Sequence, residues 1–379
     1  MRFNKNNFDL IRLFAATQVM VIHFFGHYEL EETTDNYLLH GLIELCQYFP
    51  GVPIFFMISG YLISRSYERN SDLKNYFRNR FLRLYPAAWF CLIISLMFLI
   101  YTKHLEFETL NGKSFWFWLA TEIGFIHIYS YSEFSEFGVG RLNGSLWTLQ
   151  VEFQFYIFIP ILYYIGNKIK IKEIKRYNLF MMGLLFSSFF YHEQIIKNNI
   201  LGLDAIGNIY SGDNNYLNPS NLVSKVIVNL LPNYFYMFAL GIILQKNLES
   251  IRSLIKDRAH YWLISYLTIC LSLEQLNFEI AYGNDINLIM FIFLSLVVIS
   301  IAYSKVHISE KILGRNDLSY GVYIFHMPIA NLMIEMNDKL SMNTFYFSLL
   351  LTYLFAFISW KLIEKPAMKM KKKSINTIT

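Results

Sequence analysis

The chain has 379 residues, of which 55% are hydrophobic, 18% are aromatic and only 16% are charged. A soluble domain usually carries about a quarter of charged residues, so this composition excludes a water-soluble globular protein, and its hydrophobic content excludes a disordered one. A membrane-spanning helix needs about 20 residues, so ten such helices would use roughly 200 residues and leave only modest loops. We therefore predict an all-α, polytopic integral membrane protein.

The cysteines and the net charge exclude other classes. The three cysteines are far apart and show no CxxC spacing, which favours neither a disulfide framework nor a zinc site. The net charge is +5, but the basic residues occur in short runs between apolar segments, a pattern typical of topology signals and not of nucleic-acid binding. The first apolar segment contains Asp9, Arg12 and His23 and lacks a small-residue cleavage site, so we expect no cleavable signal peptide.

The alternation of charge orients the predicted spans. The first apolar segment follows Arg2 and Lys5 and precedes an acidic loop, so it runs outward from the cytoplasm. The strongest basic run, between Arg65 and Arg83, then lies inside. Continuing this alternation gives ten spans within a membrane domain of residues 1–368, a basic cytoplasmic tail at 369–379, and both termini in the cytoplasm. The predicted spans are 9–28, 47–64, 84–101, 145–165, 177–191, 226–245, 259–274, 286–304, 318–336 and 342–363.

The stretch 115–129 is the ambiguous one. It is apolar and aromatic, but it is short and contains Glu122 and His127. A segment of about 10 to 14 apolar residues is more often re-entrant or interfacial than spanning. If it spanned, the basic run from Lys168 to Arg176 would fall outside, so we predict a re-entrant or interfacial segment.

Arg12 and His23 are the first candidates for function, because ionisable groups inside a span cost several kcal/mol and are functional by default. They are eleven residues apart, which puts them on one helix face about 16 Å apart along the axis. We interpret Arg12 as lying at the cytoplasmic mouth and His23 as lying past the midplane, a layout suited to a long substrate with an anionic head. The alternative is that Arg12 anchors the helix end and His23 is a hydrogen-bonded packing residue.

Glu152, Arg80 and Arg83 are further candidates. Glu152 lies at a predicted depth similar to that of His23, where a carboxylate would orient the imidazole; the alternative is a glutamate satisfied by polar groups of neighbouring helices. Arg80 and Arg83 have the i, i+3 spacing of one helix face and either bind phosphates bidentately or mark the cytoplasmic side.

Four other positions are less specific. Ser59 and Gly60 have the small size that close helix packing needs. His27 follows His23 by one helical turn, but no third ligand has a telling spacing, so we predict no metal site. His326 precedes Pro328 in the middle of a span, where it either contacts an acceptor or caps the backbone that proline frees.

Six segments, taken in order, resemble the signatures of the acyltransferase-3 family, which comprises polytopic membrane acyltransferases that modify bacterial cell-surface glycans. Single motifs of this kind are weak, but six collinear ones between Asp9 and Pro366 are specific. The segments are FDLIRLFAATQVMVIH, FPGVPIFFMISGYLI, RNRFLRLYP, GSLWTLQVEFQFYIFIP, LSYGVYIFHMPI and WKLIEKP.

The resemblance implies a ten-helix core in the bacterial inner membrane, an acyl-CoA donor on the cytoplasmic side and a sugar hydroxyl as acceptor. It implies that His23 is catalytic and that three arginines bind the donor, namely Arg12, Arg80 and Arg83. The second glutamate of the family's block is Phe153 here, so no role that needs two adjacent carboxylates is expected.

Together these observations predict an O-acetyltransferase that moves an acyl group, expected to be acetyl, from acetyl-CoA to a hydroxyl of a cell-surface or lipid-linked polysaccharide. His23, oriented by Glu152, either deprotonates the hydroxyl or carries the acyl group. Trp147 and His326 are expected to contact the acceptor. The rival hypotheses are a proton-coupled transporter that uses His23, Glu152 and His326 as a relay, a non-catalytic membrane scaffold, and an acyltransferase for a small-molecule acceptor.

Overall fold

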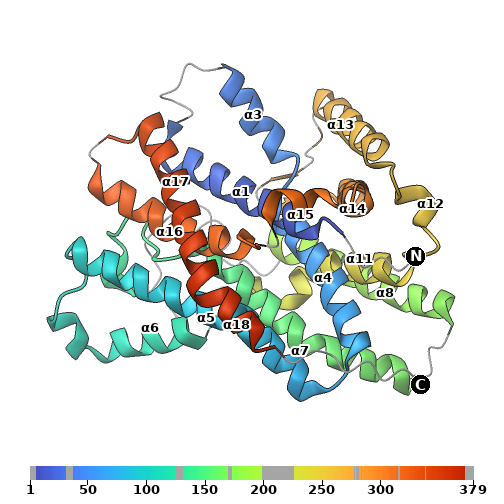
Figure 1. Ribbon diagram of the computed structural model, residues 1–379, viewed down its shortest axis with the longest axis horizontal. Helices are drawn as coiled ribbons and strands as arrows, with labels where there is room; N and C mark the ends of the chain where they lie inside the picture. Colours follow the sequence, from blue (N-terminus) through green and yellow to red (C-terminus); the bar gives the residue numbers. More distant parts are fainter. Residues whose placement is uncertain are drawn as a thin grey trace.

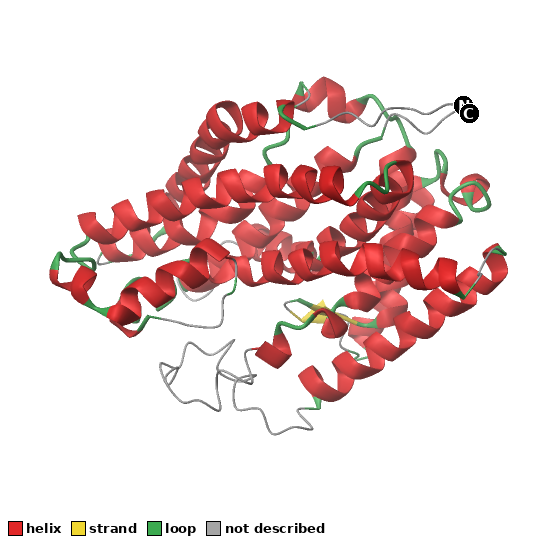
Figure 2. Cartoon of the chain, turned by 90° about the horizontal axis from the view of Figure 1, so that it is seen from below, coloured by secondary structure: helices red, strands yellow, loops and turns green. Residues whose placement is uncertain are grey.

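The computed structural model describes residues 6–30, 37–124, 126, 131–169, 173–198, 226–276, 278, 281–282, 284–314, 316–337 and 339–371. These residues are helical (Figure 2), except for loops and a two-residue antiparallel ladder in which β1 (Ala281–Tyr282) pairs with β2 (Asp285–Ile286). The predictions for Arg2, Lys5, His127 and the tail beyond Lys371 lie outside the described residues.

The longer helices, shown in Figure 1, are α1 (Phe8–His27), α3 (Tyr37–Gln47), α4 (Gly51–Arg69), α5 (Leu73–Tyr101), α6 (Lys113–Gly124), α7 (Trp147–Lys168), α8 (Ile174–His192), α11 (Phe235–Lys246), α13 (Ala259–Gln275), α14 (Leu288–Tyr303), α16 (Ser319–Met336) and α17 (Met342–Ser359). The short helical turns are η1 (Glu108–Asn111), η2 (Ser132–Phe134), η3 (Gly144–Leu146), η4 (Glu193–Lys197), η5 (Leu231–Asn233), α12 (Arg252–Ile255), α15 (Ile308–Leu313), η6 (Trp360–Glu364) and α18 (Lys365–Lys369).

Every predicted span overlaps a helix of the structure, and the protein is a multi-pass membrane protein. Within the described residues, six helical stretches are long and apolar enough to cross a bilayer. The shorter helices α11 and α14 are also apolar, while the number ten and the side of the termini stay predictions. The six stretches are Phe8–His27, Leu39–Arg69, Leu73–Tyr101, Gly144–Lys168, Ile174–Ile196 and Met342–Lys369.

The helix α5 extends beyond the predicted third span. The span is predicted to begin at residue 84, but the helix begins at Leu73, so that Arg80 and Arg83 lie within the helix. Asp72 caps this helix by accepting a hydrogen bond from the Lys74 backbone N–H at 3.3 Å. The i, i+3 spacing of the two arginines therefore puts them near one another on the helix surface.

Close packing between helices depends on glycine at several positions. A Cβ on Gly60 of α4 would lie 2.1 Å from the Phe238 carbonyl oxygen, and a Cβ on Gly241 of α11 would lie 2.1 Å from that of Met57. The prediction that Gly60 serves close helix packing is thus confirmed.

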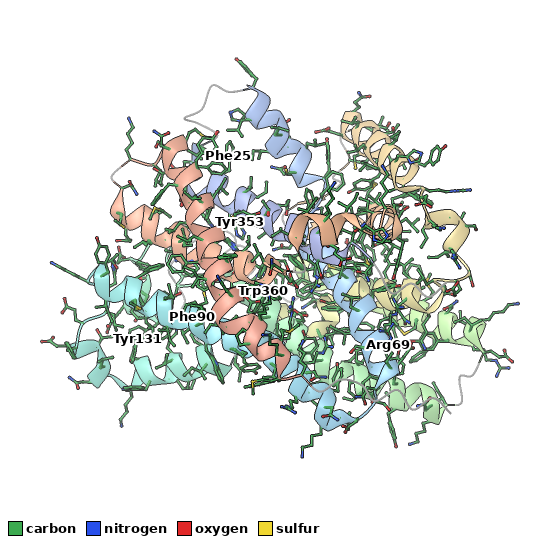
Figure 3. All side chains as sticks on the ribbon, in the orientation of Figure 1. Phe25, Arg69, Phe90, Tyr131, Tyr353 and Trp360 are labelled. Atoms are coloured by element: carbon green, nitrogen blue, oxygen red, sulfur yellow. The ribbon has the colours of Figure 1, made fainter. Side chains whose placement is uncertain are left out.

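α16 is the central helix, because every residue from Ser319 to Met333 is buried. It packs against α1, α5 and α17 (Figure 1). α17 is joined to α1 by Tyr353, labelled in Figure 3, whose hydroxyl shares a hydrogen bond of 2.5 Å with Thr17 Oγ1.

The segment 131–146 runs along α16 toward the start of that helix. Near the C-terminal end of α16, Glu335 Oε1 accepts from the Gly138 N–H at 2.7 Å; nearer the N-terminal end, Asn143 Nδ2 donates to the Ile324 carbonyl at 2.8 Å. That carbonyl is available because Pro328, four residues on, has no N–H to donate to it. The segment approaches so closely that a Cβ on Gly138, which has φ +56°, would lie 2.4 Å from Asn331 Oδ1.

As a result, α7 begins beside Tyr323, in the first third of α16. Ser145 Oγ donates to the Tyr323 carbonyl at 3.3 Å, and Thr148 Oγ1 shares a hydrogen bond of 2.8 Å with the Tyr323 hydroxyl. Residues near the start of α7 are therefore deeper than the sequence suggested.

The predicted re-entrant or interfacial stretch 115–129 overlaps α6, which is 12 residues long and begins at Lys113. α6 packs on a small hydrophobic cluster of its own, separate from the main core. Its placement relative to a bilayer stays a prediction. The buried members of the cluster are Leu99, Phe115, Trp118, Tyr131, Phe134, Phe137 and Leu142.

Candidate active site

An open cavity of about 750 Å³, a volume that includes solvent at its mouth, lies among α1, α4, α5, α7 and α16. Four of the predicted site residues line it: the three arginines and Glu152. Its polar lining residues are Arg12, Ser59, Arg80, Arg83, Thr148, Glu152, Tyr156, Ser319, Tyr320 and Tyr323.

Two of the arginines hold a buried carboxylate between them. Asp317 Oδ2 lies 2.6 Å from Arg83 Nη2 and 3.4 Å from Arg12 Nη2, and Arg12 also pairs with Asp9. Asp317 Oδ1 accepts a hydrogen bond of 2.5 Å from the Ser319 hydroxyl. Burial alone would raise the pKa of Asp317, but the two guanidinium groups hold it well below its usual range. Sequence analysis missed Asp317 because it looked like an ordinary residue at the start of a span.

Arg80 is different, because no carboxylate in the described part of the chain forms an ion pair with it. Its Nη2 donates to Ser66 Oγ at 3.1 Å, and its guanidinium carbon lies 5.8 and 5.6 Å from the ring centroids of Tyr76 and Tyr156. Its Nε is buried without a hydrogen-bond partner among the described residues. A buried donor that lacks a partner and lines a cavity is suited to an anionic ligand.

Lys371 lies next to the same arginines, just past α18, which packs on α5. Burial, together with the charges of Arg83, Arg80 and Arg12, lowers the pKa of Lys371 to about 7. The sequence indicated only a basic tail here.

Glu152 is not beside His23, so the predicted contact between them is wrong. Glu152 Oε1 accepts from Ser59 Oγ at 3.1 Å and from the Tyr156 hydroxyl at 2.7 Å. The expected depth of Glu152 assumed that α7 starts at the outer surface; because α7 starts deep, Glu152 lies lower, among residues that line the cavity with the arginines. Ser59, expected to serve packing alone, also holds this carboxylate.

His326 is the partner of His23. His23 Nδ1 lies 2.8 Å from His326 Nε2, and the two ring planes are inclined by 26° with centroids 5.1 Å apart. His326 is fully buried, and its Nδ1 lies 2.6 Å from the Tyr323 carbonyl oxygen. His23 is half-buried, and the exposed His27 has its ring centroid 5.7 Å from that of His23.

Neither histidine of this pair lines the cavity. Tyr323 does line it, and the Tyr323 carbonyl oxygen accepts the hydrogen bond from His326. Trp147, predicted to contact the acceptor, is half-buried, and its ring centroid lies 5.0 Å from that of Tyr234. The structure therefore joins two groups of predicted residues, the arginines with Glu152 and His23 with His326, through α16.

Comparisons with known proteins show what the chain is related to. A family model described as an acyltransferase domain matches residues 5–361. The chain is 28% identical over 376 residues to an O-acetyl transferase of Shigella phage Sf6, covering 95% of each protein. It is 26% identical over 377 residues to nodulation protein 10 of Rhizobium leguminosarum bv. viciae, covering 97% of this chain and 94% of that protein.

A third relative is the O-acetyltransferase OatA of Staphylococcus aureus, 24% identical over 347 residues, covering 85% of this chain and 53% of OatA. No solved structure matches the chain. The family match takes in the helices that carry the arginines, Glu152 and both histidines. The chain therefore belongs to the acyltransferase-3 family and is a multi-pass membrane acyltransferase.

Proposed function

We propose that this enzyme transfers an acyl group, acetyl in the first instance, from acetyl-CoA to a hydroxyl of a cell-surface or lipid-linked polysaccharide in the bacterial inner membrane. The single observation that carries the proposal is a cavity lined by three arginines and by Tyr323, whose carbonyl oxygen is hydrogen-bonded to the His23–His326 pair. The names of two relatives, an O-acetyl transferase and an O-acetyltransferase, support acetyl as the group transferred.

The arginine end of the cavity suits the phosphates of a CoA donor. Arg80 offers a guanidinium with no ion-pair partner in the described chain, held between two tyrosine rings. Arginine forks bind phosphates with strong, charge-assisted hydrogen bonds. Arg12 and Arg83 add positive charge, although Asp317 offsets part of it.

The far end of the cavity suits the thioester. Tyr323, Thr148 and Phe55 line it, and His23 lies beyond His326. In the proposed reaction, His23 removes the proton of the acceptor hydroxyl, whose oxygen attacks the thioester carbonyl carbon. The C–O bond forms as the C–S bond breaks, and the CoA thiolate takes the proton from His23. A route in which His23 carries the acyl group differs by a burst of CoA release before glycan product appears.

The proposal is tested with the purified protein in lipid nanodiscs, supplied with radiolabelled acetyl-CoA and lipid-linked polysaccharide from cells that lack the gene. We expect label in the glycan, and mass spectrometry of surface glycans from cells with and without the gene to show an acetyl mass difference. Label found only in a small soluble acceptor would overturn the glycan assignment. Proton-coupled uptake into vesicles, with no transfer of label, would instead identify a transporter.

A further inference from the structure

We propose that His326 is a positioning residue that fixes the tautomer of His23, so that the Nε2 atom of His23 carries the lone pair that takes the proton. This inference rests on the proposed function only in treating His23 as the reacting residue. The proposal follows from three hydrogen-bonding steps along one line of atoms.

The first step fixes the proton of His326. A backbone carbonyl oxygen only accepts hydrogen bonds, and the Tyr323 carbonyl lies 2.6 Å from His326 Nδ1. The proton of that bond therefore belongs to His326 Nδ1. Ser145 Oγ donates to the same carbonyl at 3.3 Å, which holds the start of α7 against this turn of α16.

The second step concerns His326 Nε2. The ring is fully buried, and its described neighbours are the rings of His23, Phe24 and Tyr323. No carboxylate in the described chain hydrogen-bonds to it, so an imidazolium here would be a buried charge without a counter-ion, which is costly. His326 is therefore neutral in the resting enzyme, and its Nε2 is an acceptor.

The third step determines which nitrogen of His23 carries the proton. Because His326 Nε2 accepts, the bond of 2.8 Å to His23 Nδ1 requires the proton on His23 Nδ1. In a neutral imidazole the other nitrogen then has the lone pair, so His23 Nε2 is the base. Serine hydrolases use a buried aspartate to hold the catalytic histidine in this tautomer; here a neutral ring does so, without placing a carboxylate deep in a membrane protein.

The proton inventory is consistent with the reaction. When His23 Nε2 takes the proton of the acceptor hydroxyl, His23 becomes an imidazolium whose Nδ1–H still donates to His326. The leaving thiolate then takes the proton from Nε2, and His23 returns to its starting tautomer. His326 changes neither its charge nor its protons in this cycle.

Three variants test the proposal. His326→Phe keeps a ring of similar size but removes the acceptor, whereas His326→Gln keeps an acceptor oxygen on a side chain of similar reach. His27→Phe is the matched control, because it changes a neighbouring histidine that forms no hydrogen bond with His23 in the structure. Each variant is first checked for thermal unfolding in detergent, so that only folded protein is compared.

We expect kcat of His326→Phe to fall on the order of 10² to 10⁴-fold, the usual contribution of general base catalysis, with the KM for acetyl-CoA unchanged. His326→Gln should regain at least tenfold over His326→Phe, and His27→Phe should resemble the unmodified enzyme. Equal losses in the Phe and Gln variants, or a loss that appears in KM alone, would overturn the positioning role.

A spectroscopic measurement reads the tautomer directly. In nanodiscs, protein with ring-¹⁵N-labelled histidine gives nitrogen resonances that distinguish Nδ1–H from Nε2–H, and His23→Ala identifies the signal of His23 by its loss. We expect His23 to be the Nδ1–H tautomer in the unmodified protein and to change or become mixed in His326→Phe. An Nε2–H tautomer in the unmodified protein would contradict the proposal even if acetyl transfer succeeds, and failure of transfer would leave this measurement valid.

Discussion

The cavity and the neighbouring histidine pair differ in the charged groups that surround them. At the mouth, Arg83 and Arg12 share the carboxylate of Asp317, and a third cation, Arg80, has no ion-pair partner in the described chain. His326, nine residues after Asp317, forms hydrogen bonds with a backbone carbonyl and with the imidazole of His23. No carboxylate is among its described hydrogen-bond partners. Buried charges are costly unless paired. The comparison teaches that, within the described residues, charged side chains gather around the cavity, whereas uncharged groups hold the histidine pair.

Removing the base is the change with the largest expected effect. His23→Asn should lower kcat by about 10² to 10⁴-fold, because the proton of the acceptor no longer has a base. Donor affinity, measured by equilibrium binding of acetyl-CoA in nanodiscs, should stay the same, because His23 does not line the cavity. If His23→Asn instead binds acetyl-CoA more weakly but keeps its kcat, then His23 binds the donor as the arginines are proposed to do. That outcome would contradict the distinction between a charged donor site and an uncharged site of proton transfer.

Breaking the ion pair at the mouth should mainly affect folding. Arg83→Met leaves Asp317 with only the longer contact to Arg12, and we expect a loss of about 3–5 kcal/mol in the free energy of unfolding, since it breaks a buried pair. The measurement is thermal and denaturant unfolding in detergent. Adding Asp317→Asn to this variant should recover part of the loss, and equal instability of the single and double variants would contradict the assignment.

The same carboxylate gives a pH dependence. Because the pKa of Asp317 is lower in the folded protein than in the unfolded chain, its ionised form stabilises the fold at neutral pH. This contribution is present above the ordinary aspartate pKa of about 4 and is lost as the pH falls below it. The difference in stability between the unmodified protein and Asp317→Asn should therefore shrink in acid, whereas a constant difference would point to packing.

Arg80 tests whether the mouth binds the donor. Arg80→Gln should raise the KM for acetyl-CoA by roughly 10- to 100-fold, the equivalent of one charge-assisted hydrogen bond, and leave kcat nearly unchanged. Arg78→Gln is the matched control, because Arg78 lies on the same helix but does not line the cavity. Equal effects of the two variants would show that the basic residues act only as topology signals.

The smallest expected effect is at Lys371. Its pKa of about 7 means that it gains a proton as the pH falls through neutrality, and the extra positive charge favours an anionic donor. Donor affinity should therefore be greatest below pH 7 and weaken a few-fold as the pH rises above it. In Lys371→Met this part of the pH dependence should vanish; if it persists, another group near the mouth titrates.

The sequence predicted the helices well because apolar length and charge alternation are local signals. It also predicted that Arg80 and Arg83 share a helix face, since that depends on a spacing of three residues. It failed where contacts are distant along the chain. Asp317 meets Arg83 across 234 positions, and His23 meets His326 across 303, and no local pattern reports such pairs.

The sequence predicts a depth for Glu152 that differs from the structure, and only part of the physical reason can be recognised in the sequence. The segment before α7 runs inward because Asn143 bonds the carbonyl that Pro328 leaves free. The proline was noticed in the sequence, but the partner of its freed carbonyl lies 181 positions away. A single sequence shows that Pro328 leaves a carbonyl without its helical partner, but it does not show that Asn143 binds that carbonyl.

The helix α16 fixes the spacing between three parts of the protein. Ser319 lines the cavity, His326 is hydrogen-bonded to His23, and Glu335 binds the segment 131–146; all three stand on one continuous helix. At 1.5 Å per residue, the sixteen steps from Ser319 to Glu335 measure about 24 Å, and each step also turns the helix by about 100°. One residue inserted in this stretch would therefore shift one part of α16 against the other by about 1.5 Å and turn it by about 100°, so that the cavity, the histidine pair and the segment 131–146 would no longer be in register with one another.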